Sequence, residues 1–180
     1  SPHDVNLRLG VYRGAANRTT TRVALSPGRL PDEGYLLTAT QSWEDGTVSL
    51  ELHRLAAKVA SGSTRLPAEA DSYCLGLRRE GGLLVAAIND ADVLAYDDPE
   101  PVSAPCLGFQ VKGGGLVRPD DIRVASRDLR NHTFDDAPTD WFIQSGEWEL
   151  TSRWPCTPGW AWFSGVSKQE ALIRTKARIT

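Results

Sequence analysis

The stretch Glu44-Asp-Gly-Thr-Val-Ser-Leu-Glu-Leu-His-Arg54 carries a turn signal followed by strict alternation. Asp45-Gly46 is a pair that marks turns, and from Val48 to Leu52 every second residue is apolar. A period of two places all the apolar side chains on one face of an extended chain. The stretch therefore predicts a half-buried β-strand that begins just after a turn.

A helix is the competing interpretation for the residues that follow, because Glu51–Ala60 is rich in good helix formers. The alternation up to Leu52 instead favours a strand that leads into a hairpin near Ala56-Ala57. A surface helical turn is the other helical candidate, near Pro119–Asp121. For the first half of Glu51–Ala60 we expect a strand.

The same alternation recurs along the chain, with turn signals such as Glu80-Gly-Gly82 and Asn89-Asp90 between the segments. Regularly spaced strands of this kind are typical of sandwiches and barrels. The other alternating sets are Val5, Leu7, Leu9 and Val11; Tyr73, Leu75 and Leu77; Leu83, Val85 and Ala87; and Ala171, Ile173, Thr175, Ala177 and Ile179.

Composition limits the partners. The 180 residues suffice for one core, and 41% hydrophobic with 24% charged residues is ordinary for a globular domain. A net charge of -3 argues against nucleic acid as the main partner. The sequence has no apolar run of about 18 residues, which predicts no membrane insertion. It also lacks Met, so we expect a processed or excised piece of a larger protein.

The three cysteines, Cys74, Cys106 and Cys156, form no CxxC or Cys/His cluster of the kind that binds zinc. A metal-thiolate site is therefore not expected. Whether any two of them form a disulfide is left open.

The segment 134–148 differs from the rest of the chain in its residue pattern. It contains Phe134, Asp135-Asp136, Trp141 and then Ser145-Gly146-x-Trp148. It resembles the opening of the concanavalin A-like (laminin-G-like) domains of many large bacterial proteins. Earlier segments, including Tyr73-Cys-Leu-Gly-Leu-Arg-Arg79 and Ala87-Ile-Asn-Asp90, resemble the remainder of such a domain. The resemblance implies an all-β fold, a two-sheet antiparallel jelly-roll-like sandwich.

The order of these segments is out of phase, because the opening comes last. We expect a single domain over residues 1–180, with 134–180 supplying the strands that normally open it. A circular permutation, a strand-swapped oligomer and a fragment cut from a tandem array all fit this order.

The resemblance also implies a concave sheet face that can hold sugars. Some relatives are glycoside hydrolases with an E-x-D-x-x-E strand, a pattern that this sequence lacks. We therefore expect a non-catalytic carbohydrate-binding or spacer module of a larger extracellular or cell-surface protein, whose partners are a glycan or neighbouring domains. A glycoside hydrolase or lyase acting on a polysaccharide in the concave face is the alternative, and a purely structural repeat is a third.

Candidate ligand-binding residues follow from side-chain chemistry. Trp43, Trp160 and Trp162 are the candidates for stacking on sugar faces, and we expect at least one of them to pack in the core instead. Glu51 and His53 share one strand face with Ser49, where a solvated surface is the alternative. Calcium is a possible cofactor, held by the paired carboxylates Asp120, Asp121, Asp135 and Asp136, although Asp pairs also begin turns.

Overall fold

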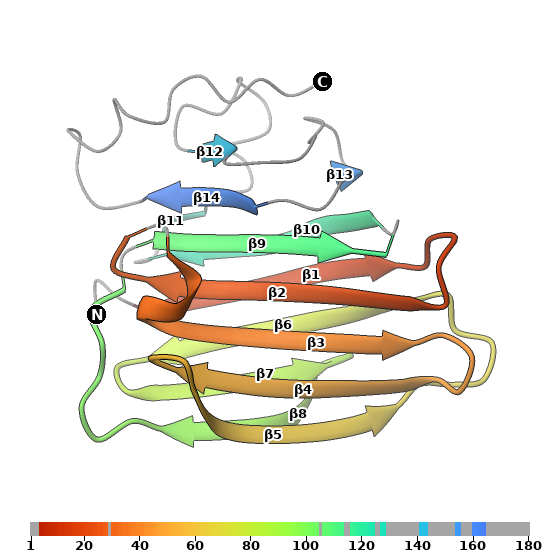
Figure 1. Cartoon of the computed structure of the whole chain (residues 1–180), viewed down its shortest axis with the longest axis horizontal. Coiled ribbons are helices and arrows are strands. Elements are labelled where there is room, and N and C mark those ends of the chain that lie inside the picture. Colours follow the sequence, from red (N-terminus) through yellow and green to blue (C-terminus); the bar gives the residue numbers. More distant parts are fainter. Residues whose placement is uncertain are drawn as a thin grey trace.

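Two antiparallel sheets face each other in the computed structural model of the chain (Figure 1). The structure describes residues 4–28, 30–104, 106–113, 116–124, 127–128, 141–143, 154–155 and 160–164. After residue 113, Val117 is the one position whose side chain it describes. Within this part of the chain the helical structure is the short 3-10 turn η1, Pro31–Glu33, and no helix is long and apolar enough to cross a membrane.

Sheet A has the order β11-β10-β1-β6-β7-β8, and β13 also pairs with β10. Its strands are β1 (Val5–Tyr12), β6 (Ser72–Glu80), β7 (Leu83–Ile88), β8 (Ala91–Asp97), β10 (Leu116–Val124), β11 (Arg127–Asp128) and β13 (Trp154–Pro155).

Sheet B has the order β12-β14-β9-β2-β3-β4-β5. Its strands are β2 (Arg18–Ser26), β3 (Tyr35–Ser42), β4 (Thr47–Arg54), β5 (Ala57–Arg65), β9 (Cys106–Lys112), β12 (Trp141–Ile143) and β14 (Trp160–Ser164). From β1 to β10 the chain changes sheet after β1, β5, β8 and β9. This arrangement confirms the predicted all-β, two-sheet antiparallel sandwich.

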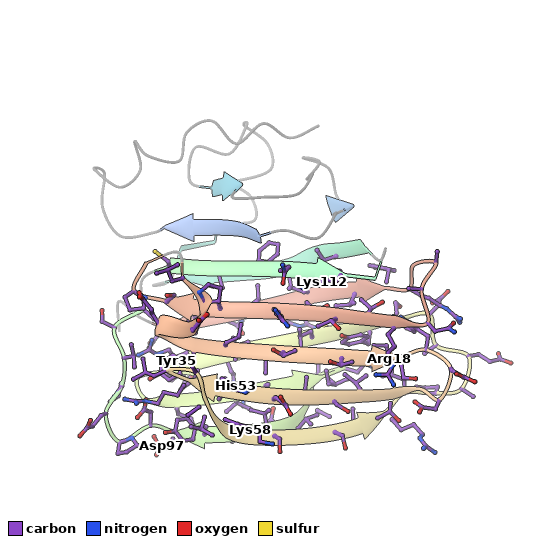
Figure 2. The ribbon with its side chains drawn as sticks, in the orientation of Figure 1. Arg18, Tyr35, His53, Lys58, Asp97 and Lys112 are labelled. Atoms are coloured by element: carbon purple, nitrogen blue, oxygen red, sulfur yellow. The ribbon has the colours of Figure 1, made fainter. Side chains whose placement is uncertain are left out.

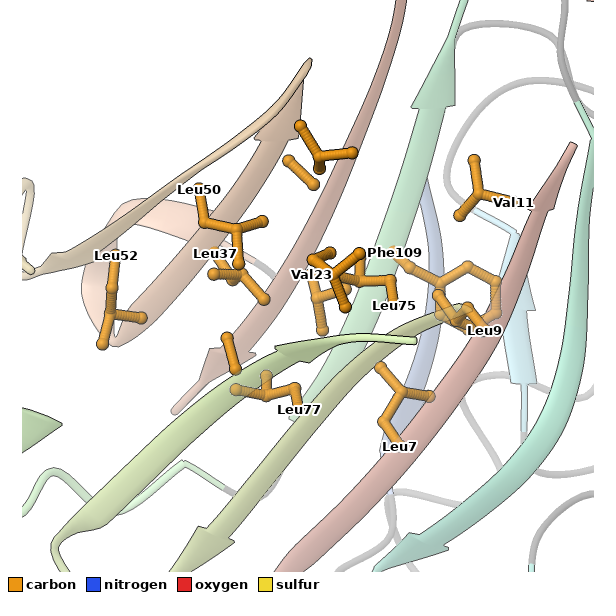
Figure 3. Packing of buried hydrophobic residues seen from close by; sticks show 14 of the residues in the cluster. Leu7, Leu9, Val11, Val23, Leu37, Leu50, Leu52, Leu75, Leu77 and Phe109 are labelled. Atoms are coloured by element: carbon orange, nitrogen blue, oxygen red, sulfur yellow. The ribbon is translucent and has the colours of Figure 1, made fainter. Parts of the chain in front are cut away.

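The core fills the space between the two sheets (Figure 3). The alternating sets of β1, β4 and β6 point into it as predicted, and residues such as Leu7, Leu52 and Leu75 are fully buried. Burial of a side chain of this size contributes about 1.5–3 kcal/mol. Removal of these apolar faces from water is the main force that holds the sheets together.

The inward face predicted for β7, formed by Leu83, Val85 and Ala87, is wrong. Leu84, Ala86 and Ile88 pack in the core, so Leu83, Val85 and Ala87 face outward from sheet A. The segment Leu83–Ile88 is apolar at every position, and such a strand carries no alternation that identifies its inner face.

Both helical alternatives are resolved in favour of strands. Residues 51–60 belong to β4 and β5, joined by a two-residue turn at Leu55-Ala56 in which both φ angles are positive, 49° and 68°. The predicted hairpin is thus confirmed. Pro119–Asp121 lies within β10, so the helical turn considered there is wrong. Pro119 sits at a register shift against β1, a position that tolerates the missing N–H of proline.

A polar cluster closes one end of the sandwich, where the segment 98–104 crosses from β8 to β9. Asp98 Oδ2 accepts hydrogen bonds from the Tyr35 hydroxyl at 2.6 Å and from Arg54 Nε at 2.5 Å. Arg79 Nη2 donates to the Val102 carbonyl at 2.6 Å, and the guanidinium of Arg79 lies 5.0 Å from the centre of the Tyr35 ring. Tyr35 and Arg54 belong to sheet B and Arg79 to sheet A, so the cluster ties both sheets to the crossover.

The described parts of segment 134–180 pair with both sheets. β14 lies beside β9 in sheet B, with Trp160 opposite Gln110 and Trp162 opposite Gly108. β13 lies beside β10 in sheet A. That these strands are the ones that open the domain in relatives stays a prediction, and the strand expected at Ala171–Ile179 lies outside the described residues.

Candidate functional site

The outward face of sheet B carries the polar side chains of its strands. Because Val48, Leu50 and Leu52 of β4 point into the core, Ser49, Glu51 and His53 must point out. Figure 2 looks onto this face, with His53, Lys58 and Lys112 labelled on three different strands. The sequence alternation that predicted β4 therefore also predicted which of its residues reach this surface.

Strand register aligns polar residues from four strands in one row. Gln110 of β9 lies opposite Arg22 of β2, Arg22 opposite Thr38 of β3, and Thr38 opposite Glu51 of β4. At about 4.8 Å between strands the row is roughly 14 Å long. Segments that are far apart in the sequence thus present donors and acceptors side by side.

A hollow of about 330 Å³ opens on this face at the end nearest the β4–β5 turn. Strand residues form its floor and the η1 segment forms one wall. The lining residues are Arg22, Pro31, Asp32, Gly34, Leu36, Thr38, Glu51, His53 and Ala56. Glu51 and His53, both predicted as ligand-binding residues, are brought together in it.

The η1 wall is fixed by short contacts to the strands. Ser26 Oγ donates to the Leu30 carbonyl at 2.6 Å, and the Leu55 amide donates to the Gly34 carbonyl at 2.9 Å. A side chain at Gly34 would collide with the Leu25 carbonyl, so the close approach of this segment to β2 requires glycine. The wall is therefore part of the folded framework.

Several polar atoms on this face are buried and lack a hydrogen-bond partner among the described residues. They are Nδ1 of His53, Nε of Arg22 and Oε1 of Gln110. Such atoms are rare in folded proteins, because an unpaired buried polar group costs about 1–3 kcal/mol. A ligand with hydroxyl groups would supply the missing partners for the two that line the hollow, His53 and Arg22.

Glu51 differs from these groups because it is exposed and already has a weak partner. Lys58 Nζ lies 3.9 Å from its Oε1, and the two side chains are 56% and 50% exposed. An ion pair this accessible contributes little stability, about 0–1 kcal/mol. Glu51 is thus available to accept hydrogen bonds from a bound molecule.

Trp43 does not lie on this face. Its side chain is 5% exposed, its indole Nε1 donates to Thr19 Oγ1 at 2.8 Å, and its ring centre lies 6.2 Å from that of Tyr73. The residue belongs to the core cluster. Core packing, the alternative to stacking on a sugar, is what the structure shows for Trp43.

The other predicted site residues lie where side chains are not described. Trp160 and Trp162 occupy β14, next to Gln110 and Gly108 of β9, so their backbone borders the polar row. Asp120 and Asp121 lie in β10, and Asp135 and Asp136 fall outside the described residues. The described part of the chain contains no group of three or more His, Cys, Asp or Glu that could hold a metal, and the calcium site stays a prediction.

Two of the three cysteines belong to the described part of the chain. Cys74 lies in β6 and Cys106 in β9, and no disulfide joins these two. Cys156 lies outside the described residues, so pairing with it stays open.

A second depression, on the outward face of sheet A, is smaller, at about 150 Å³. Its arginines already have carboxylate partners. Arg8 lies 2.9 Å from Asp90, and Arg78 makes two hydrogen bonds to Asp92, at 3.2 and 3.1 Å. Because these charges are paired, this depression offers a ligand less than the hollow on sheet B.

Arg22, Asp32, Thr38 and Gln110 belong to the site but are not predicted by the sequence. Arg18, Thr20 and Arg22 recur with a period of two, which is the signal that could have placed Arg22 on an outward strand face. Asp32 reaches the hollow only through the fold of η1, which has no comparable sequence signal.

No protein-family model matches the chain, and a search of curated proteins found no match. Solved structures with a similar fold include galectin LEC-6 of Caenorhabditis elegans, with 19% identity and a TM-score of 0.46 over 67% of this chain and 83% of that one. The carbohydrate binding module CBM66 of Bacillus subtilis has 14% identity and a TM-score of 0.47 over 67% and 73%. A prokaryotic β-1,3-1,4-glucanase (lichenase) from a mouse hindgut metagenome has 8% identity and a TM-score of 0.43 over 91% and 66%.

Because all of these TM-scores are below 0.5, they do not assign this chain to a family or an activity. The class of protein is defined by its own two sheets, which form the antiparallel, jelly-roll-like sandwich that the sequence predicted. The out-of-phase order of that resemblance stays a prediction.

Proposed function

We propose that this chain is a non-catalytic carbohydrate-binding module whose binding surface is the hollow on the outward face of sheet B. The observation that carries the proposal is the set of His53, Arg22, Thr38 and Glu51 on three adjacent strands around one hollow. Sugars present many hydroxyl groups, which pair with mixed donors and acceptors of this kind. The side chains stand on strands, which hold a binding geometry more precisely than loops do.

The two carboxylates in the hollow favour binding over catalysis. A glycoside hydrolase needs one carboxyl group that stays protonated near neutral pH, usually in surroundings that exclude water. Glu51 and Asp32 are both exposed. They suit hydrogen bonding to hydroxyl groups better than proton donation to a leaving oxygen.

A hydrolase or lyase remains the second candidate, because two carboxylates do line the same hollow. The role as part of a larger extracellular or cell-surface protein belongs to the same proposal and is supported by the sequence resemblance to domains of large bacterial proteins. In that setting neighbouring domains are further partners.

The test is a glycan array followed by calorimetric titration of any polysaccharide that binds. We expect Glu51→Gln and His53→Ala to weaken binding roughly tenfold each while the melting temperature stays unchanged. Glu80→Gln is the matched control, because Glu80 is an exposed carboxylate of sheet A. Binding that these site variants leave intact would contradict the proposed surface.

A reducing-end assay on the same polysaccharides separates the two candidates. Release of reducing ends by the wild type that is lost in Glu51→Gln would replace the binding module with a hydrolase. Formation of unsaturated products absorbing near 235 nm would indicate a lyase.

A further inference from the structure

We infer that the glycan bound on sheet B is acidic, a polysaccharide that carries carboxylate or sulfate groups. This inference rests on the proposed function and names the chemistry of its ligand. It begins from charge, because the chain as a whole is acidic, with a formal net charge of -3. The outward strand positions of sheet B, around and beyond the hollow, have the opposite sign.

The charges at outward strand positions of sheet B are mostly positive. The register and alternation of β2, β3, β4, β5 and β9 place one carboxylate there, Glu51. The Lys and Arg residues at the same set of positions are Arg18, Arg22, Lys58, Arg65 and Lys112. A cationic face on an acidic protein attracts anions locally and repels them elsewhere.

These cations differ from those on sheet A in their partners. Arg8 and Arg78 on sheet A are each paired with an aspartate, at 2.9 and 3.1 Å. Arg18, Arg22 and Lys112 make no ion pair with any residue in the described part of the chain. Arg8 and Arg78 are therefore neutralised within the chain, whereas Arg18, Arg22 and Lys112 are left for an external anion.

Arg22 is placed to contact such an anion directly. It lines the hollow, and its Nε is a buried donor without a partner among the described residues. A guanidinium presents parallel N–H donors that match the two oxygens of a carboxylate or sulfate. Lys112 lies one row further along, opposite Thr20, and extends the positive surface beyond the hollow.

The carboxylates in the hollow favour an acidic sugar over a polynucleotide. Asp32 and Glu51 line the same hollow as Arg22 and His53. A phosphate on every nucleotide would be repelled by them, whereas an acidic sugar offers hydroxyl groups to the carboxylates and its anionic group to Arg22. The mixture of both charges fits a ligand that carries both kinds of group.

The experiment compares polygalacturonate with its carboxyl-reduced, neutral form, alongside dextran sulfate, dextran, neutral xylan and β-glucan, by titration against the whole chain. We expect binding to at least one acidic polymer, at least tenfold tighter than to its neutral counterpart and weaker as salt is raised from about 50 to 300 mM. A preference for polygalacturonate or for dextran sulfate identifies carboxylate or sulfate as the anionic group.

Charge-matched variants locate the effect. Arg22→Gln and Lys112→Gln should weaken acidic-polymer binding, by roughly 10- to 100-fold for Arg22→Gln. Arg78→Gln removes the same charge from sheet A and should leave the affinity unchanged. Equal losses in all three variants would mean that only the overall charge matters and would overturn the inference.

The remaining outcomes separate this inference from the proposed function. Equal affinity for acidic and neutral polymers would overturn the acidic preference and leave carbohydrate binding in place. Binding to none of the polymers would contradict both. Single-stranded DNA is titrated under the same conditions. Tighter binding of this DNA than of any acidic polysaccharide would also overturn the inference and identify a polynucleotide as the better ligand.

Discussion

The hydroxyl group of Tyr35 in sheet B donates a 2.6 Å hydrogen bond to Oδ2 of Asp98, the residue that follows the last strand of the β6–β8 meander in sheet A. The same hydroxyl oxygen accepts a hydrogen bond from the Val102 amide at 2.9 Å. One side chain therefore fixes both the first residue and a later residue of the crossover into β9.

Replacing Tyr35 with Phe should destabilise the fold without changing its shape. The variant removes one of the three hydrogen bonds that Asp98 accepts and leaves the Val102 amide without an acceptor. We expect a loss of roughly 1–3 kcal/mol in the free energy of unfolding. Urea denaturation measures it. Tyr12→Phe is the control and should change stability by less than about 0.5 kcal/mol, because the Tyr12 hydroxyl makes no hydrogen bond to any residue that the structure describes. Equal effects in the two variants would contradict the role of the cluster.

Asp98 should make stability sensitive to acid. Burial raises its pKa, but hydrogen bonds from Tyr35, from the Glu100 amide and from Arg54 outweigh burial and hold the pKa below the usual value of 3.8. A carboxyl group with a lowered pKa in the folded state stabilises the fold above pH 3.8, and this contribution is lost as the pH falls toward the folded-state pKa.

Asp98→Asn tests this dependence through the difference between two curves of unfolding free energy against pH. The variant should be less stable than the wild type at pH 7, and the gap should narrow below about pH 4. Curves that stay parallel down to pH 3 would show that Asp98 is not responsible.

The Leu55-Ala56 turn should gain stability from glycine. Both residues have positive φ, a conformation that costs a residue with a Cβ about 1 kcal/mol and costs glycine nothing. We expect Ala56→Gly to raise the unfolding free energy by about 0.5–1 kcal/mol. The matched control is Ala57→Gly at the start of β5, which should lower stability instead. A loss at both positions would indicate that the turn is not strained.

Trp43→Phe should separate stability from binding. The substitution removes the indole donor to Thr19 Oγ1 and leaves that buried hydroxyl unpaired, at a cost of roughly 1–3 kcal/mol. Affinity for any glycan that the chain binds should not change, because Trp43 lies between the sheets. A variant that keeps its melting temperature and loses binding would restore the ligand-binding role predicted from the sequence.

Truncation after residue 133 tests how the chain is divided into domains. β14 pairs with β9 along its whole length, from Trp160 opposite Gln110 to Ser164 opposite Cys106. Without it, β9 becomes an exposed edge next to buried apolar residues, and such edges promote aggregation. We expect residues 1–133 to aggregate or to lose cooperative unfolding. A soluble fragment with one sharp unfolding transition would contradict a single domain over 1–180.

How far the sequence predicts the fold depends on which side chains face inward. β4 was predictable because its inward residues are Val48, Leu50 and Leu52. β2 was not recognised, because Thr19 and Thr21 are fully buried polar residues in its inward set and hide the alternation. The face of β7 was misassigned for the opposite reason, since that strand is apolar throughout.

The sequence also predicted only some of the residues of the candidate site. Glu51 and His53 follow from the alternation of one strand, whereas Arg22 and Asp32 join them through pairing and loop geometry that no local pattern encodes. Trp43 carried a usable signal: Tyr35, Leu37, Ala39 and Gln41 form the inward set of β3, and Trp43 continues it with the same period. Extending the alternation by one step would have placed the indole in the core.

The pairing of β1 has a consequence for the order in which the molecule forms. Both neighbours of β1 come from much later in the chain: Tyr12 meets Ser72 on one side and Leu116 on the other. A ribosome adding about 5–20 residues per second needs several seconds to reach even the nearer partner. During that interval the nascent chain carries Leu7, Leu9 and Val11 without a strand beside them. β2 and β3 pair locally and can form early, so β1, although it is synthesised before them, is among the last of these strands to gain both neighbours.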